Sequence, residues 1–383
     1  MALIDTSPTS VATRGIERMR APLDRARHVP GSIYTSPEVL AREKEVLFLK
    51  DWLMVCREEE VEKPGDFMTF RILGEPVVVT RDQTGVLRAF ANVCLHRGVE
   101  VAIGAGSTRE FMCPYHGWLY DLEGKLVGAP YMKEADGFDP KDCRLPPLRL
   151  ATWGGCVFIC FDPSTPPFEV AAADWIRELS FLHPERCRLS KKIVLDLDCN
   201  WKFLIENVMD MYHAHTLHGA SFGKHTSYDG LNVKLFKNGG VRSDYASGPL
   251  APEGKTLFGK LPWLADKPDH FALFSYMQPN TYLVCRVDQV RILITWPEGP
   301  DKCRGLMYSL FPKEHFAAPD FWERADKYHD YLAYVLGEDA DMVRSLQRGM
   351  TTRAFAPGPM APLEMAIHHF MNAYLDRMFG VAA

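Results

Sequence analysis

The chain has 383 residues, of which 47% are hydrophobic and 24% charged, an ordinary composition for a globular protein long enough to form two domains. Its net charge of -5, without any dense basic run, gives no reason to expect nucleic acid as a partner. No apolar stretch approaches membrane-spanning length and the N-terminal stretch has no apolar signal core, so we expect a cytoplasmic protein with no membrane association. Ten cysteines without regular spacing argue against a disulfide framework.

The N-terminal third predicts an all-β module behind an irregular segment. Residues 1–35 show no regular pattern and are expected to pack across another element or a neighbouring subunit. Ser36 can cap a helix that runs to Phe48, with Pro37 at its first position. Short Val- and Phe-rich stretches separated by Gly and Pro turns then predict strands from about residue 52 to residue 161.

Two loops of this module carry a metal-binding pattern. Cys94 and His96 lie in one loop, and Cys113 and His116 follow after sixteen intervening residues. A two-iron cluster held by two thiolates on one iron and two imidazoles on the other needs this ligand set, and the imidazoles raise its reduction potential. Tetrahedral zinc is the competing interpretation, although zinc fingers usually order their ligands Cys-Cys and then His-His.

The second half of the chain mixes helix and strand patterns. A linker over Asp162–Phe168 predicts a domain boundary. From Lys191 a strand leads into a helix that runs from Trp201 to about His218. Residues 220–265, with weak periodicity, suggest a mobile surface segment or a lid over a pocket. The remaining patterns are strands between residues 271 and 311 and helices over residues 319–336, 338–350 and 361–379.

The helix near residue 210, ENVMDMYHAHTLHGA, concentrates a second set of potential ligands. Two histidines and one carboxylate on one face of the metal are typical of mononuclear iron that activates O2. Asp210 and His213 share a face of an ideal helix. His213 and His218 are about 140° apart on such a helix, so they can bind one metal only if the helix ends or is distorted near Thr216–Gly219. His215 with His218 fits a regular helix better, and spacing alone leaves the choice open.

Together, the two motifs resemble those of the Rieske-type ring-hydroxylating oxygenases. C-x-H-R-G and C-P-Y-H-G-W match that family's cluster loops, and E-N-x-x-D-x-Y-H-x4-H matches its iron helix. The resemblance implies an α+β protein in which an N-terminal antiparallel-β Rieske domain precedes a helix-grip-like α+β catalytic domain with an antiparallel sheet. The implied cofactors are a Rieske [2Fe-2S] cluster and mononuclear Fe(II). The expected parts are a segment that packs on the catalytic domain (1–38), the Rieske domain (39–162) and the catalytic domain (163–383).

The resemblance also implies roles for individual residues. His213 and His218 become iron ligands. Asp210 becomes the polar link, through hydrogen bonds, toward a Rieske histidine, and Asn207 is the other expected catalytic residue.

The third iron ligand is expected on a C-terminal helix, where the family pattern is E-D followed by Q-R-G. That pattern selects Asp339, with Asp341 as its rival. Both acids would otherwise be solvated residues in a helix's first turn, where the helix dipole favours them.

The implied function is that of the terminal oxygenase component of a multicomponent system. Reductive O2 activation would hydroxylate an aromatic or related small organic substrate, by ring dihydroxylation as in aromatic hydrocarbon catabolism, or by monooxygenation, including N- or O-dealkylation. No dinucleotide- or flavin-binding signature is present, so electrons must come from a ferredoxin, an NAD(P)H-dependent reductase or both. In the family, electrons pass between neighbouring subunits, which implies a homotrimer. The alternative is a Rieske electron-transfer protein without oxygenase activity.

The substrate pocket is expected among the later strands. Arg286 and Arg291 could bind a carboxylate there, although arginines on strands more often face water. The apolar candidates, which suit a sheet core equally well, are Phe222, Leu231, Phe274, Met277, Tyr282, Val284 and Leu293.

Overall fold

The computed structural model describes residues 15–380, and its internal contacts divide them into two compact units. The smaller unit is Leu49–Pro166, and the larger joins residues 15–48 to the chain from Pro167 onward. The smaller unit thus starts ten residues after the expected residue 39, because the helix before Leu49 packs into the larger unit. Residues 1–14 of the expected N-terminal segment lie outside the described residues.

The smaller unit is antiparallel throughout. Its hydrophobic core contains Phe90, Trp118 and Tyr120 and includes the thiols of Cys94 and Cys113. The strands of its main sheet, in spatial order, are β1 (Leu53–Arg57), β10 (Cys156–Cys160), β9 (Pro147–Trp153), β4 (Leu87–Ala91), β3 (Glu75–Arg81), β2 (Asp66–Ile72) and β5 (Ala105–Ser107). A three-stranded sheet is formed by β6 (Glu110–Met112), β7 (Leu119–Asp121) and β8 (Leu126–Gly128).

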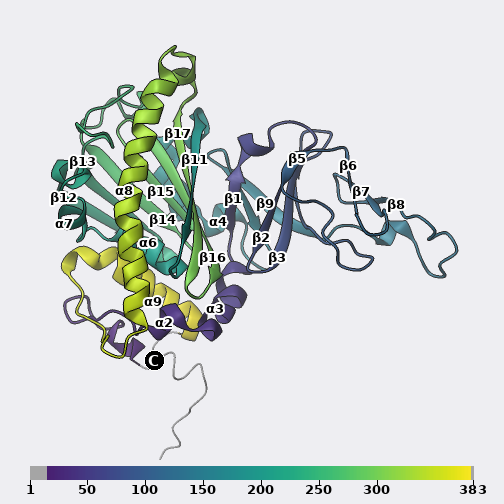
Figure 1. Ribbon diagram of the computed structural model, residues 1–383, viewed down its shortest axis with the longest axis horizontal. Coiled ribbons are helices and arrows are strands. Elements are labelled where there is room, and N and C mark those ends of the chain that lie inside the picture. Colours follow the sequence, from purple (N-terminus) through teal and green to yellow (C-terminus); the bar gives the residue numbers. More distant parts are fainter. Residues whose placement is uncertain (1–14, 381–383) are drawn as a thin grey trace, which may run out of the picture. The chain divides into compact units, whose positions relative to one another are not determined.

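The larger unit is built on a seven-stranded antiparallel sheet with helices packed against it. A long helix, α8 (Phe321–Met350), lies along the sheet (Figure 1), and α6 (Trp201–Met209) contacts both the helix and the central strands. The α+β class predicted from the sequence is therefore confirmed. The strands, in spatial order, are β11 (Cys187–Leu197), β17 (Lys302–Pro312), β16 (Gln289–Gly299), β15 (Thr281–Arg286), β14 (Phe271–Met277), β13 (Val241–Ser247) and β12 (Thr226–Leu235).

The expectation of a mobile segment over residues 220–265 is wrong for its first half. Residues of β12 and β13 are paired strands of the sheet. Strand β12 is the edge strand, has a single buried residue, and shifts register between Ser227 and Asn232. An exposed and interrupted edge strand loses the alternation of polar and apolar residues from which a strand is recognised.

The helix before the smaller unit begins at the cap that the sequence predicts. Ser36 Oγ accepts a hydrogen bond from the Val39 amide at 3.2 Å and caps a helix that continues through a π-helical turn to Phe48, as predicted. None of the helices in residues 15–380 is both long and apolar enough to cross a membrane. The other helices are α2 (Ser32–Thr35), α3 (Pro37–Glu43), α4 (Phe168–Ala171), α5 (Ala173–Leu179), α7 (Ala214–Leu217) and α9 (Met365–Phe379).

A buried ion pair joins three of these helices. Lys202 Nζ of α6 lies 2.5 Å from Glu43 Oε1 of α3, and both side chains are fully buried. Glu43 also accepts hydrogen bonds from Trp201 Nε1 at 2.8 Å and from the Tyr374 hydroxyl of α9 at 2.6 Å. These contacts fix the start of α6, the helix that leads to the second ligand cluster.

Candidate metal centres

The first candidate centre lies on two loops of the smaller unit. Cys94 and Cys113 are buried in its core, whereas His96 and His116 are exposed, with ring centroids 4.6 Å apart. Each loop turns back tightly, because Gly98 donates its backbone N–H to the carbonyl of Cys94 and Gly117 donates to that of Cys113. The loops thus present two inner thiols and two outer imidazoles.

The placement of these four side chains fits a two-iron cluster better than zinc. In residues 15–380, no three of their donor atoms lie within 4.8 Å of one another, as closure around a single ion would require. The Tyr120 hydroxyl lies 3.4 Å from Cys94 Sγ, and burial raises the pKa of this tyrosine. A protonated hydroxyl beside a cluster thiolate donates a hydrogen bond to it, which is one way in which proteins raise a cluster's potential.

The second candidate centre depends on a break in the helix that carries the histidines. Helix α6 ends at Met209, and Asp210 is extended at φ -72° and ψ 108°, so the break comes earlier than the expected Thr216–Gly219. His213 directly precedes the short helix α7 and His218 directly follows it. Their Nε2 atoms are therefore 3.2 Å apart despite a spacing that a regular helix would forbid.

A glycine absent from the sequence prediction holds the second histidine in place. The Gly223 amide donates to the His218 carbonyl at 2.8 Å. A Cβ atom at position 223 would lie 2.3 Å from the Ala214 carbonyl oxygen, closer than any real contact. The glycine at position 223 was the sequence signal for this contact, because glycine allows two backbone segments to approach closely.

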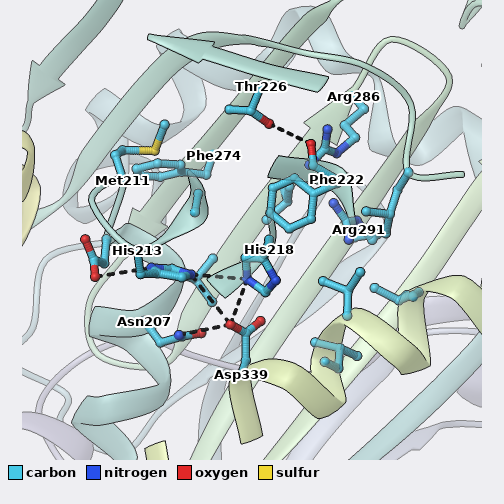
Figure 2. A pocket seen from close by; sticks show the side chains of 18 of the residues that line it. Asn207, Met211, His213, His218, Phe222, Thr226, Phe274, Arg286, Arg291 and Asp339 are labelled. Atoms are coloured by element: carbon cyan, nitrogen blue, oxygen red, sulfur yellow. Dashed lines mark hydrogen bonds and ion pairs between the residues drawn. The ribbon is translucent and has the colours of Figure 1, made fainter. Parts of the chain in front are cut away.

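The carboxylate that completes this cluster comes from the middle of α8. Asp339 Oδ1 lies 3.0 Å from His218 Nε2 and 3.6 Å from His213 Nε2 (Figure 2). The rival Asp341 points away, with a 78% exposed side chain beside Arg344. His215 also points elsewhere, with Nε2 3.1 Å from the Thr226 carbonyl oxygen. Within residues 15–380, His213, His218 and Asp339 are the group of side chains that could enclose a single ion.

Each of these three side chains is held by a polar neighbour. Asp210 Oδ2 lies 3.2 Å from His213 Nδ1, and Asn207 Nδ2 donates to Asp339 Oδ1 at 3.1 Å. Glu338 Oε2 lies 2.9 Å from His218 Nδ1, a contact that could not be predicted from the sequence although Glu338 begins the E-D pattern. Carboxylates that hold the outer nitrogen of a ligating imidazole fix its tautomer and orientation.

The electrostatics of the cluster favour a cation. Burial lowers the pKa of His213, but Asp210 and Asp339 outweigh this effect and raise the pKa to about 9. Burial raises the pKa of Asp339, but its contacts with the two histidines outweigh this and lower it. Without metal, protonated histidine would supply the positive charge that balances Asp210 and Asp339. A divalent ion can replace that proton, and the two imidazoles and one carboxylate are the donor set that suits iron with open positions.

A cavity adjoins the three ligands. Phe222, Phe274 and Val284 line it as expected, together with Tyr245 and Met307. The other apolar candidates, which do not line it, are Leu231, Met277, Tyr282 and Leu293. Arg286 and Arg291 also line the cavity (Figure 2), so of the two alternatives left open by the sequence they do not simply face water.

Comparison with known families identifies the chain. Residues 184–380, just over half of the chain, match the family model described as "Ring hydroxylating alpha subunit (catalytic domain)", and residues 51–149 match the Rieske [2Fe-2S] domain. The chain belongs to the Rieske-type ring-hydroxylating oxygenases. It is an oxidoreductase and the terminal oxygenase component of such a system, with a Rieske [2Fe-2S] cluster and mononuclear iron as cofactors. A catalytic domain of this type leaves no support for the alternative of a simple electron carrier.

Among its relatives, this Rieske oxygenase is 27% identical to the chloroplastic choline monooxygenase of Spinacia oleracea, over 96% of the chain and 82% of the relative. It is 33% identical over 202 residues to the carnitine monooxygenase oxygenase subunit of Acinetobacter pittii, or 51% of the chain and 53% of that subunit. Its fold resembles the crystal structure of the quaternary ammonium Rieske monooxygenase CntA in complex with L-carnitine. The TM-score is 0.76 at 24% identity, covering 92% of this chain and 96% of that one.

Proposed function

We propose that this oxygenase is a monooxygenase of a small quaternary ammonium or related N-alkyl compound. The observation that carries the proposal is the convergence of His213, His218 and Asp339 at a cavity with aromatic walls. Tyr245 and Phe274 line this cavity, and aromatic rings suit a methylated cation because they attract cationic nitrogen through their quadrupoles. The relatives named for choline and carnitine monooxygenation point to the same substrate class.

The chain's own residues would hold the reacting groups in place. Cys94, His96, Cys113 and His116 would hold the cluster, and His213, His218 and Asp339 the iron. When bound, the two centres supply single electrons and reductive O2 activation. Asp210, Glu338 and Asn207 keep the three iron ligands in orientation through the contacts described above. The apolar cavity walls exclude water from the bound substrate.

We further propose that the active form is a homotrimer that receives its electrons from a ferredoxin, an NAD(P)H-dependent reductase or both. Asp210 touches His213 and is 22% exposed in its side chain, so it can take part in a contact with a group outside the iron site. The solved structure of a quaternary ammonium Rieske monooxygenase, 24% identical to this chain, gives insight into inter-subunit electron transfer in that protein. Under this proposal, Asp210 is the residue through which electrons pass from a neighbouring subunit's cluster to the iron site. We also propose that the protein works in the cytoplasm.

Product analysis with isotopically labelled O2 tests the proposed reaction. The reconstituted oxygenase is given a reductase, NADH and, separately, choline, carnitine, glycine betaine and naphthalene. We expect one labelled oxygen atom per product molecule from at least one quaternary ammonium compound, and no product without the reductase. Two labelled atoms in a single product of naphthalene, with no turnover of the ammonium compounds, would contradict the proposal and establish ring dihydroxylation.

A further inference from the structure

Two arginines extend from neighbouring strands into the cavity beside the iron ligands. Arg286 ends β15 and lies two residues after Val284, on the same face of the strand. Arg291 of β16 pairs directly with Val284 across the sheet, and Val284 in turn pairs with Phe274 of β14. The sheet register thus places both guanidinium groups along one cavity wall, where Figure 2 shows them together beside Phe222.

Contacts within the fold leave hydrogen-bonding capacity on the guanidinium groups of both arginines. Arg291 is 7% exposed, and no hydrogen bond or ion pair reaches its guanidinium from any other residue that the structure describes. Arg286 is 3% exposed and donates through one terminal nitrogen to Ser247 and Gly248, but its Nε has no partner in residues 15–380. A buried charge without a partner is strongly destabilising, so such groups persist where a ligand supplies the missing partner.

In the described part of the chain, the acid beside the pair does not hold either guanidinium in an ion pair. Asp288, next along the hairpin, is buried, and burial raises its pKa to about 6 although both arginines act in the opposite direction. Burial also lowers the pKa of Arg286, and the neighbouring Arg291 adds to that effect. An anion bound between the two guanidinium groups would offset both the cost of burying their charges and the repulsion between them.

The distance from the arginines to the proposed iron ligands sets the length of the molecule that can bind in the cavity. The Phe222 ring centroid lies 4.6 Å from that of His218 and 4.9 Å from Arg286 Cζ. One aromatic ring therefore separates a guanidinium group from a proposed iron ligand. A small molecule can reach across this gap, with its anionic end at the arginines and its reacting carbon at the metal.

We infer that the substrate carries a carboxylate, which Arg286 and Arg291 bind. Planar guanidinium groups match the two oxygens of a carboxylate, and the pair disfavours a substrate that is only cationic. The inference rests on the proposed function in taking this cavity as the substrate site. Combined with that proposal, it selects zwitterionic ammonium carboxylates over amino alcohols.

Matched probe pairs test the inference by calorimetric titration of the iron-loaded holoenzyme. Glycine betaine is compared with choline, and benzoate with benzyl alcohol, because the members of each pair differ in having a carboxylate or an alcohol on the same skeleton. We expect the carboxylate member of at least one pair to bind tenfold or more tighter, on the order of one charge-assisted hydrogen bond. Equal binding within both pairs, or no detectable binding of either carboxylate, would overturn the inference.

Two substitutions test whether the arginines cause the preference for a carboxylate. Arg291→Met is expected to abolish it, whereas Arg304→Met, a matched change of an exposed arginine on β17, is expected to leave it intact. Because no hydrogen bond or ion pair holds the Arg291 guanidinium within the described residues, its replacement is also expected to keep or raise the melting temperature. A lower melting temperature with unchanged carboxylate preference would show a structural arginine and contradict the inference.

The two proposals fail in different ways. If choline is turned over but neither carboxylate probe is preferred, the carboxylate inference fails and the monooxygenase proposal stands. If benzoate alone is preferred and no ammonium compound reacts, the proposed substrate class fails and the carboxylate site stands.

Discussion

Replacing His213 by alanine is expected to abolish turnover while leaving the red-brown Rieske cluster intact. The substitution removes one of three donors that meet beside the cavity, where His213 Nε2 lies 3.2 Å from His218 Nε2. Removing a residue that only hydrogen-bonds a metal ligand commonly weakens metal binding or activity 10- to 100-fold. Removing the ligand itself is therefore expected to lower turnover by more than about 100-fold. Iron analysis, visible absorption and product formation with the native reductase measure the three properties separately.

His215→Ala is the matched control for this prediction. His215 is two residues away in the same motif, but its ring stacks on Tyr228 and its Nε2 faces the Thr226 carbonyl rather than the cavity. We expect this variant to keep its full iron content and at least most of its activity. Turnover by the His213 variant at the level of the His215 variant would exclude His213 as an iron ligand.

Replacing Glu43 by alanine is expected to destabilise the larger unit by about 3–5 kcal/mol, the usual effect of removing one partner of a buried ion pair. The change leaves the fully buried Lys202 ammonium without its carboxylate. It also removes the acceptor for Trp201 and Tyr374, so helices α3, α6 and α9 all lose a contact. Urea unfolding followed by tryptophan fluorescence, with Trp201 inside the network, measures the loss.

Two further variants separate charge from packing in this network. Glu45→Ala alters an exposed acid two residues away and is expected to change the free energy of unfolding by less than about 0.5 kcal/mol. The double substitution Glu43→Leu with Lys202→Met removes both charges and is expected to recover much of the lost stability. If the double variant is no more stable than Glu43→Ala, the unpaired Lys202 charge is not the cause of the loss.

The cluster loops could be predicted because their ligands lie close together in the sequence and their order is distinctive. The antiparallel β-module around them and the cap at Ser36 followed from turn residues and capping chemistry. Local signals of this kind do not depend on the rest of the fold. For this reason, Cys94, His96, Cys113 and His116 could be predicted as cluster ligands without knowledge of any tertiary contact.

The iron site was harder to predict because tertiary contacts override helix periodicity. No Pro or Gly marks the break at Asp210, so the meeting of His213 and His218 could not follow from spacing. The sequence predicted two helices, 319–336 and 338–350, but α8 runs without a break from Phe321 to Met350. Asp339 is therefore a mid-helix residue, and the explanation of a solvated first-turn acid does not apply.

The sequence left open, for a related reason, whether Arg286 and Arg291 face the cavity or water. Strand alternation shows that Val284 and Arg286 share a face, but not whether that face meets water or a cavity. Only the pairing of β15 with β16 and the helices above the sheet show that the face is enclosed.

Quantitation of iron and acid-labile sulfide in purified, iron-replete protein, with an EPR spectrum of the dithionite-reduced sample, tests the two-centre account most directly. We expect three irons and two sulfides per chain, two irons in the cluster and one at the histidine–aspartate site, with a Rieske-type signal on reduction. Two irons per chain would leave the catalytic domain without its metal, and a colourless protein containing zinc would contradict both centres.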